Sequence, residues 1–262
     1  MTLGQGLRLF PTWDGHFLVG QRSKAALTEV DLTIGDRKER LPVHKIQSRP
    51  SGDEVVMRAE YDGEIAYVVS STFVGDDPEA LAQCYEIGRR CREYPHVIWD
   101  LSNNLGGNSE FARQFLQGLS GVRPSMGRVL SLNSTLVHAK EWGEIQEQPY
   151  GFAQEPQEPG EGACLFHGTL HVIVNDRVAS SGESAVFMAL SLPQVVLYGC
   201  STLGIGRFGD LCVYTLPNSH ITLWCPQKSF EQAPEEGVGY EPDVWIDSQD
   251  VAATVKRYIK TL

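Results

Sequence analysis

The chain has 262 residues, of which 42% are hydrophobic, and it carries a formal net charge of −11 with a pI near 5.1. This charge disfavours a nucleic acid or an acidic membrane as partner, because both attract cationic surfaces. The sequence starts without a basic region followed by a long apolar stretch, and no later window approaches about 18 uninterrupted apolar residues. We therefore predict a folded, cytoplasmic globular protein with no membrane span, whose N-terminus can be incomplete.

The six cysteines are spread along the chain, with no Cys-x-x-Cys pair and no nearby His at metal-ligand spacing. Cys84 and Cys91 are seven residues apart on a predicted helix and so share one of its faces. We predict reduced, mostly buried thiols, with no metal site and no cofactor.

Residues 1–52 contain short apolar stretches separated by Gly, Asp and Pro, which predict a small β-rich section ahead of a core over 53–262. Residues 54–60 and 64–70 alternate apolar and polar side chains around Asp62-Gly63, a dipeptide suited to a tight hairpin. They predict two antiparallel strands. Asp77-Pro78 then supplies a cap and a first-turn proline for the predicted helix DPEALAQCYEIGRRCREY.

Strands and helices alternate through the rest of the chain, which predicts an α/β layer structure with a mostly parallel sheet flanked by helices. The predicted elements are strand 96–101, helix 109–119, strand 170–174, helix 182–191, strand 195–199, strands near 211–215 and 221–225, strand VWI and helix 248–260. Residues 137–163 are rich in Glu, Gln, Pro and Gly, a composition that disfavours helix and strand and predicts a long surface loop or lid.

Three strand-to-helix loops are polar and rich in glycine: DLSNNLGG, ASSGE and GCSTLGIGRFGD. Ligands bind beyond the carboxyl ends of parallel strands, so we expect the loops to converge on one cleft, with Ser180 and Gly107 on the same face. Gly106-Gly107 can be a plain turn, yet adjacent glycines also let backbone N–H groups approach a reacting carbonyl.

Two adjacent serines lie in the second of these loops. With Ser180 as a helix cap, Glu183 occupies the third helical position and completes a capping box. A hydroxyl at a helix N-terminus also suits a nucleophile, since N–H dipoles there stabilise developing negative charge. The segment alone leaves both roles open, with capping the commoner of the two.

Five blocks occur in order and at plausible spacing: VIWDLSNNLGGNSEFARQFLQ, HVIVNDRVASSGESAVFMAL, VVLYGCSTLGIGRFGD, LPNSHITL and GVGYEPDVWI. Together they resemble the core of the tail-specific or C-terminal processing serine protease family, to which the tricorn protease core is related. The resemblance implies a Clp protease/crotonase-like core with Ser180 as nucleophile and an oxyanion hole from Ser181 beside Gly106 and Gly107. It also implies a peptide or unfolded protein substrate cut through an acyl-enzyme, and it leaves the oligomeric state open.

One departure from the family concerns the base. Processing proteases of this family carry a lysine between two glycines to deprotonate the serine, and here Ile205 stands in its place. Ile has no proton-accepting group, and Arg207 stays protonated. Branches that resemble tricorn use a histidine and a glutamate just before a G-x-x-P-D block, which implies Glu236, with Glu235 as a close alternative.

The choice of histidine is open among seven residues: His16, His44, His96, His138, His167, His171 and His220. His96 and His171 begin predicted strands and suit structural roles, whereas His16 follows a turn upstream of the core and is our choice. Too little sequence precedes residue 60 for a complete PDZ domain, so residues 1–52 suggest the remnant of a truncated domain. A serine peptidase and an inactive protein that binds peptides or small apolar ligands are both kept as hypotheses, and Ile205 favours the second.

Overall fold

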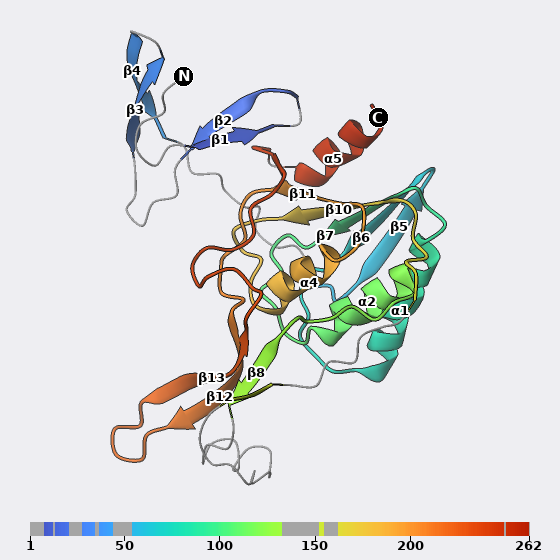
Figure 1. Cartoon of the computed structure of the whole chain (residues 1–262), viewed down its shortest axis with the longest axis vertical. Helices are drawn as coiled ribbons and strands as arrows, with labels where there is room; N and C mark the ends of the chain where they lie inside the picture. The colour runs from blue at the N-terminus through green and yellow to red at the C-terminus, as the bar shows by residue number, and fades with distance from the viewer. Residues whose placement is uncertain are drawn as a thin grey trace.

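The computed structural model describes residues 8–12, 14–20, 28–34, 37–43, 54–132, 152–154, 162–248 and 250–261. Its centre is a six-stranded sheet, parallel except for β5 (Figure 1). In spatial order its strands are β14 (Val244–Trp245), β11 (Val195–Gly199), β10 (Thr169–Val174), β7 (His96–Asp100), β6 (Ile65–Val69) and β5 (Arg58–Asp62). The predicted α/β core with a mostly parallel sheet is confirmed, as is the antiparallel hairpin across Asp62-Gly63.

Four helices in the described part of the chain flank this sheet. They are α1 (Pro78–Cys91), α2 (Glu110–Ser120), α4 (Ser181–Ala189) and α5 (Val251–Ile259). Val97 and Trp99 of β7 belong to the core cluster that contains α1, α2 and α4, whereas Ile98 between them packs in the cluster with α5. Helices therefore cover both faces of the sheet, and its strands are apolar on both sides.

Helix α1 begins as its sequence predicts. Asp77 Oδ1 accepts a hydrogen bond from the N–H of Glu79 at 3.1 Å, and Pro78 occupies the first turn. Cys84 and Cys91 both lie in the core, where burial raises the pKa of each thiol to about 12. Neither is a thiolate nucleophile at neutral pH, and all six cysteines are free.

Three smaller sheets lie outside the central one. Their strands are β12 (Phe208–Thr215), β13 (Thr222–Phe230), β8 (Val129–Leu132) and β9 (Phe152–Gln154) in one sheet, β1 (Arg8–Pro11) with β2 (Phe17–Gly20), and β3 (Glu29–Ile34) with β4 (Arg37–Pro42). The last two hairpins form the predicted β-rich N-terminal section, while its boundary at residue 52 stays a prediction. The Phe10 ring lies 4.2 Å from that of Trp245, so β1 contacts the end of the central sheet.

Most of the predicted loop over 137–163 lies outside the described residues. Within it, Phe152–Gln154 form β9, which pairs with β8 through Leu132↔Phe152 and two further residue pairs. The prediction that this stretch contains no strand is wrong for these three residues, because pairing with an existing strand outweighs local composition. In the described ranges, no helix is long and apolar enough to cross a bilayer.

Candidate active site

The carboxyl ends of β7, β10 and β11 meet at one edge of the central sheet, as predicted. Ala179, after β10, donates its N–H to the carbonyl of Asn104, after β7, at 2.9 Å. Leu203, after β11, donates to the carbonyl of Val178 at 2.9 Å. The three glycine-rich loops therefore lie side by side where open α/β sheets bind ligands.

Ser180 lies at the turn into α4 with φ 51° and ψ −122°, in a region that residues other than glycine rarely adopt. Its side chain makes no capping hydrogen bond to α4, and the Glu183 carboxylate bonds elsewhere. The capping-box interpretation of these two residues is therefore wrong. Strain of this kind costs about 1–3 kcal/mol, persists only where the surrounding structure imposes it, and clusters at functional sites.

The Gly106-Gly107 loop runs against this turn. Ser181 Oγ donates to the Gly107 carbonyl at 2.5 Å, so Gly107 and the serine turn share one face, as predicted. At Gly106, with φ 106°, an added Cβ would lie 2.8 Å from Ser180 Cβ. At Gly107, with φ 128°, it would lie 2.2 Å from the Phe73 carbonyl oxygen. Only glycine permits this close approach.

The backbone N–H groups around Ser180 differ in their partners. The N–H of Gly106 donates to Asn104 Oδ1 at 2.9 Å. Across the described ranges, the N–H groups of Gly107 and Ser181 have no acceptor. Two free donors beside a serine hydroxyl are the arrangement that stabilises an oxyanion.

Asn104 is a site residue that the sequence analysis did not single out. It is fully buried, and its Nδ2 donates to the Ser70 carbonyl at 2.9 Å while its Oδ1 accepts from Gly106. The side chain thus fixes the glycine loop to the end of β6. Its sequence signal is an Asn two residues before a Gly in a loop, because Asn side chains bond their own backbone two residues on.

Glu183 connects α4 to the loop after β11. The side chain is buried, and its carboxylate accepts from Thr202 Oγ1 at 2.5 Å, the N–H of Gly204 at 2.9 Å and the N–H of Ile205 at 2.8 Å. Burial raises the pKa of Glu183, and these three donors act in the opposite direction. The residue holds in place the loop that carries Ile205.

Five exposed aliphatic side chains lie on the loops around Ser180. Each is at least 41% exposed, and they are Val74, Leu105, Leu203, Ile205 and Val238. The backbone contacts place these loops together: Gly107 approaches Val74, and Gly204 approaches Val238. We call this set the aliphatic rim. Exposed apolar side chains gathered on neighbouring loops are a candidate binding surface for an apolar group.

Glu236 lies in an exposed turn whose next residue, Gly237, donates to the Gly204 carbonyl at 2.5 Å. Its charge acts on Glu183 and raises the pKa of that residue. His16 is exposed and its Nδ1 lies 3.1 Å from Asp14. Within the described residues, His16 contacts neither Ser180 nor Glu236, and both catalytic assignments stay predictions.

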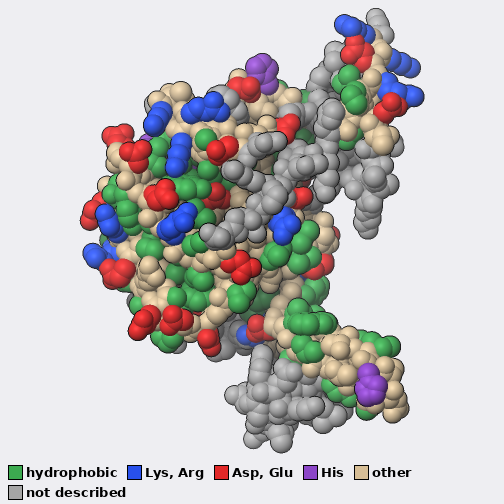
Figure 2. Space-filling view, turned by 180° about the vertical axis from the view of Figure 1, so that it is seen from behind, with side chains coloured by type: hydrophobic (Ala, Val, Ile, Leu, Met, Phe, Trp, Pro, Cys, Tyr) green, Lys and Arg blue, Asp and Glu red, His purple; other side chains and the backbone are tan. Residues whose placement is uncertain are grey.

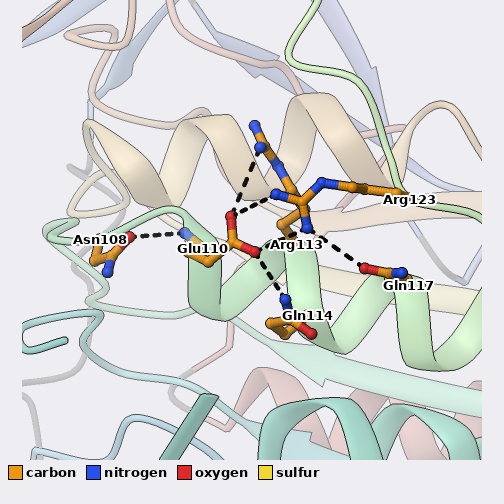
Figure 3. A network of polar contacts seen from close by, with 6 residues as sticks. All are labelled: Asn108, Glu110, Arg113, Gln114, Gln117 and Arg123. Atoms are coloured by element: carbon orange, nitrogen blue, oxygen red, sulfur yellow. Dashed lines mark hydrogen bonds and ion pairs between the residues drawn. The ribbon is translucent and has the colours of Figure 1, made fainter. Parts of the chain in front are cut away.

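A polar network begins where the glycine loop enters α2 (Figure 3). Asn108 Oδ1 accepts from the N–H of Glu110 at 2.9 Å, and the Glu110 carboxylate accepts from Arg123 at 2.9 and 3.1 Å and from Gln114 at 2.8 Å. Arg113 Nη1 lies 3.6 Å from the same carboxylate. A bidentate Arg–carboxylate pair fixes geometry as well as charge, so this network holds the start of α2 beside the site.

A small cavity lies beside Glu183. Its lining residues are Met126, Glu183, Ser184, Phe187, Gly206, Phe230, Ala233 and Tyr240. The Tyr240 hydroxyl is buried there without a hydrogen-bond partner among the described residues. The cavity has room for little more than one water molecule and is too small for a substrate side chain. In the same part of the chain, no group of three or more His, Cys, Asp or Glu residues could hold a metal ion.

No protein-family model matches this sequence, and no curated protein matches it. Solved structures do match. A protein assigned as an S41 protease from Bacteroides fragilis gives a TM-score of 0.54 at 12% identity, over 89% of this chain and 65% of that chain. Mature CPAF in complex with lactacystin gives 0.53 at 13% identity, over 89% and 66%. A protein assigned as a peptidase from Parabacteroides merdae gives 0.53 at 14% identity, over 78% and 64%.

The chain thus spans less than two thirds of the length of these three proteins. At these identities the likeness concerns the fold. The chain has the α/β fold of S41 proteases, which agrees with the fold that the resemblance of its sequence blocks implies.

Proposed function

We propose that this chain is a serine peptidase that cleaves peptide or unfolded protein segments through an acyl-enzyme at Ser180. The observation that carries the proposal is a serine hydroxyl held at positive φ beside the unpartnered N–H groups of Gly107 and Ser181 in the described structure. The likeness to S41 proteases supports it at the level of fold. We further propose that the cleavage is tail-specific or C-terminal processing, which rests on the resemblance of the five sequence blocks alone.

In the proposed reaction, Ser180 Oγ attacks the carbonyl carbon of a peptide bond while its proton passes to a base. The resulting oxyanion accepts hydrogen bonds from Gly107 and Ser181, and loss of one such donor typically costs about 10²–10³ in turnover. The C–N bond then breaks and the amine leaves with a proton. Water hydrolyses the acyl ester and regenerates the hydroxyl.

The base we propose is His16, with Glu236 as the carboxylate that orients it. This assignment requires His16 to leave Asp14 and approach the cleft. A general base contributes about 10²–10⁴ in rate, and His16 has to move before it can act while Ile205 offers no amine in its place, so we expect slow acylation by peptides. An activated phosphonate, whose leaving group departs without protonation, should react more readily.

A fluorophosphonate probe tests the proposal. Ser180 Oγ would form a bond to phosphorus as fluoride leaves, and mass spectrometry locates the modified residue. We expect wild-type protein to be labelled at Ser180 and Ser180→Ala to be unlabelled. Ser181→Ala is the matched control, because it removes the neighbouring hydroxyl and keeps both Ser180 and the backbone donor.

Two outcomes would overturn the proposal: wild-type protein that stays unlabelled, or Ser180→Ala that is labelled as fast as wild type. In the first case the second candidate function applies, which is a non-catalytic protein that binds an apolar peptide or small ligand. The aliphatic rim favours this alternative, because it presents apolar side chains and includes Ile205 at the position of the family lysine. Leu203→Asp should then weaken binding of an uncharged peptide.

A further inference from the structure

The β12–β13 hairpin extends away from the body of the molecule (Figure 1). Only the end of β13 is held by a further strand in the described sheet, through the pairs Lys228↔Ser131, Ser229↔Leu130 and Phe230↔Val129. Residues 222–227 of β13 pair with β12 alone. A two-stranded hairpin without further support is marginally stable in water, so this projecting part needs a covering surface.

The projecting part of the hairpin carries almost no charge. Residues 211–227 contain no Asp, Glu, Lys or Arg, although such residues make up 21% of the chain. Asp210 and Lys228, at the base, form an ion pair with each other at 2.6 Å. Figure 2 shows the hairpin at the lower right as apolar and neutral atoms with one histidine. Natural proteins usually protect an exposed edge strand such as β12 with charges, and here that protection is missing from residues 211–215.

The two faces of the hairpin differ in exposure. The pairing sets Leu211 opposite Pro226, Val213 opposite Trp224 and Thr215 opposite Thr222, and all six side chains are exposed. We call these six residues the hairpin face. Trp224 is 65% exposed, Leu211 52% and Val213 41%.

The opposite side of the same strands behaves differently. Cys212 and Gln227, which point away from the hairpin face, are almost fully buried. Toward the tip this side also opens, since Leu223 is 40% exposed. The buried groups at the base fix the register, because a one-residue slip would bring them to the surface. The apolar residues of the hairpin face are therefore exposed in the correct strand register, and not because the two strands are paired one residue out of place.

We propose that the hairpin face is the contact between two copies of this chain in a two-fold dimer. In such an interface each residue meets the same patch of its partner, so the patch must be compatible with itself. Two copies with a net charge of −11 repel each other, and a surface without charge is where they can meet. The hairpin face meets this condition, and a strongly charged partner would find no complementary charge on it.

The size of the hairpin face sets the affinity expected for the dimer. Six residues on two strands cover less than the approximately 800 Å² per partner of a standard interface. We therefore expect a weak, reversible dimer with a dissociation constant in the micromolar range. Added salt should strengthen the dimer, because it screens the repulsion between the acidic bodies.

Sedimentation analysis of the full chain over a range of protein concentrations tests the proposal. We expect wild-type protein to shift from monomer to dimer as concentration rises, and Trp224→Lys to stay monomeric. Lys is chosen because it lowers the net negative charge, so lost association cannot come from added repulsion. Leu190→Lys, at the C-cap of α4, is the control and should dimerise like wild type; Leu190 is 43% exposed, close to the 41% of Val213.

Circular dichroism melting of each variant separates loss of association from loss of folding. The proposal holds if Trp224→Lys is folded and monomeric where wild type is dimeric. If Trp224→Lys unfolds, Val213→Lys takes its place in the same measurement. The proposal is overturned if wild type is monomeric up to its solubility limit, or if folded hairpin-face variants dimerise as well as wild type. Monomeric wild type that binds an uncharged extended peptide through Trp224 would assign the face to that partner instead.

Discussion

Ser180 and Ser181 are neighbours with different partners, and this difference separates their roles. Ser181 Oγ is held by the Gly107 carbonyl and ties the glycine loop to α4. Ser180 Oγ has no hydrogen-bond partner among the described residues, and its φ of 51° turns it away from the helix it precedes. A hydroxyl kept out of capping at a cost of about 1–3 kcal/mol is free for chemistry.

Ile205 is the residue whose replacement should raise the rate. Its N–H is fixed by Glu183 and its side chain is exposed, so Ile205→Lys introduces an amine without a buried charge. If the amine reaches Ser180 as the family lysine does, peptide hydrolysis should rise by at least about tenfold, at the low end of what general bases contribute. Release of an amine from a peptide library measures this rate.

Phe208→Lys is the control for that variant, since it adds the same amine three residues further along the chain, at an exposed residue outside the aliphatic rim. It should leave the hydrolysis rate close to that of wild type. An equal rise in both variants would point to a general effect of positive charge on an acidic protein. A rise of less than tenfold in Ile205→Lys would mean that the missing lysine does not explain weak activity.

At the scale of elements, the site depends on how α4 holds the loop after β11. One buried carboxylate, Glu183, receives three donors from that loop. Glu183→Gln removes the charge and turns one acceptor into a donor that faces other donors. A hydrogen bond to a charged group contributes about 1.5–3 kcal/mol, so we expect the free energy of unfolding to fall by about 2 kcal/mol. Urea unfolding of Glu183→Gln and wild type measures this free energy.

This variant also separates two interpretations of the motif. A capping box accepts Gln as well as Glu, so it predicts little change on Glu183→Gln. Glu86→Gln is the control, because Glu86 is exposed and pairs only with Arg89 in the described structure. Equal stability of Glu183→Gln and wild type would contradict the role assigned to Glu183 here.

Sequence analysis predicted the elements better than the contacts between them. Alternating apolar residues and the Asp62-Gly63 turn placed the β5–β6 hairpin, and Asp77-Pro78 placed the start of α1. The same rules failed at Ser180 and Glu183, because capping preferences describe a helix alone and the Glu183 carboxylate bonds a loop after another strand. β9 was missed for the same reason, since its partner β8 is a separate segment of the chain. At Asn104 the local bond to Gly106 follows a known loop pattern, whereas the bond to Ser70 joins residues 34 apart in sequence and could not be foreseen.

At the scale of the whole molecule, one chain of polar residues crosses the sheet away from the site. His96 Nδ1 lies 3.3 Å from His171 Nε2, and His171 Nδ1 lies 3.0 Å from the Tyr198 hydroxyl. The three residues lie on β7, β10 and β11. His171 is buried, with only 1% of its surface accessible. Burial lowers its pKa to about 4, and the nearby His96 contributes to this shift as the smaller cause. The structural role predicted for His171 agrees with this burial, whereas His96 is half-buried and its role stays a prediction.

The last prediction concerns acid stability. His171 has a folded pKa of about 4, below its usual 6.5, so the unfolded chain binds a proton first as the pH falls. The stabilising effect of a neutral His171 is therefore complete above about pH 6.5 and is lost as the pH falls toward 4. Each pKa unit corresponds to about 1.4 kcal/mol, so the loss is on the order of 3 kcal/mol.

His171→Gln removes the group that titrates. Urea unfolding of wild type and of this variant at about pH 7 and pH 4 then isolates the contribution of His171 to stability. Carboxylates change the stability of both proteins alike as the net charge of −11 shrinks, so only the difference between them reports on His171. The destabilisation caused by His171→Gln should shrink toward acid pH by the amount given above. Tyr198→Phe is the control: it keeps the buried imidazole and should keep the wild-type pH dependence. A destabilisation by His171→Gln that is the same at both pH values would show that this histidine does not titrate on unfolding.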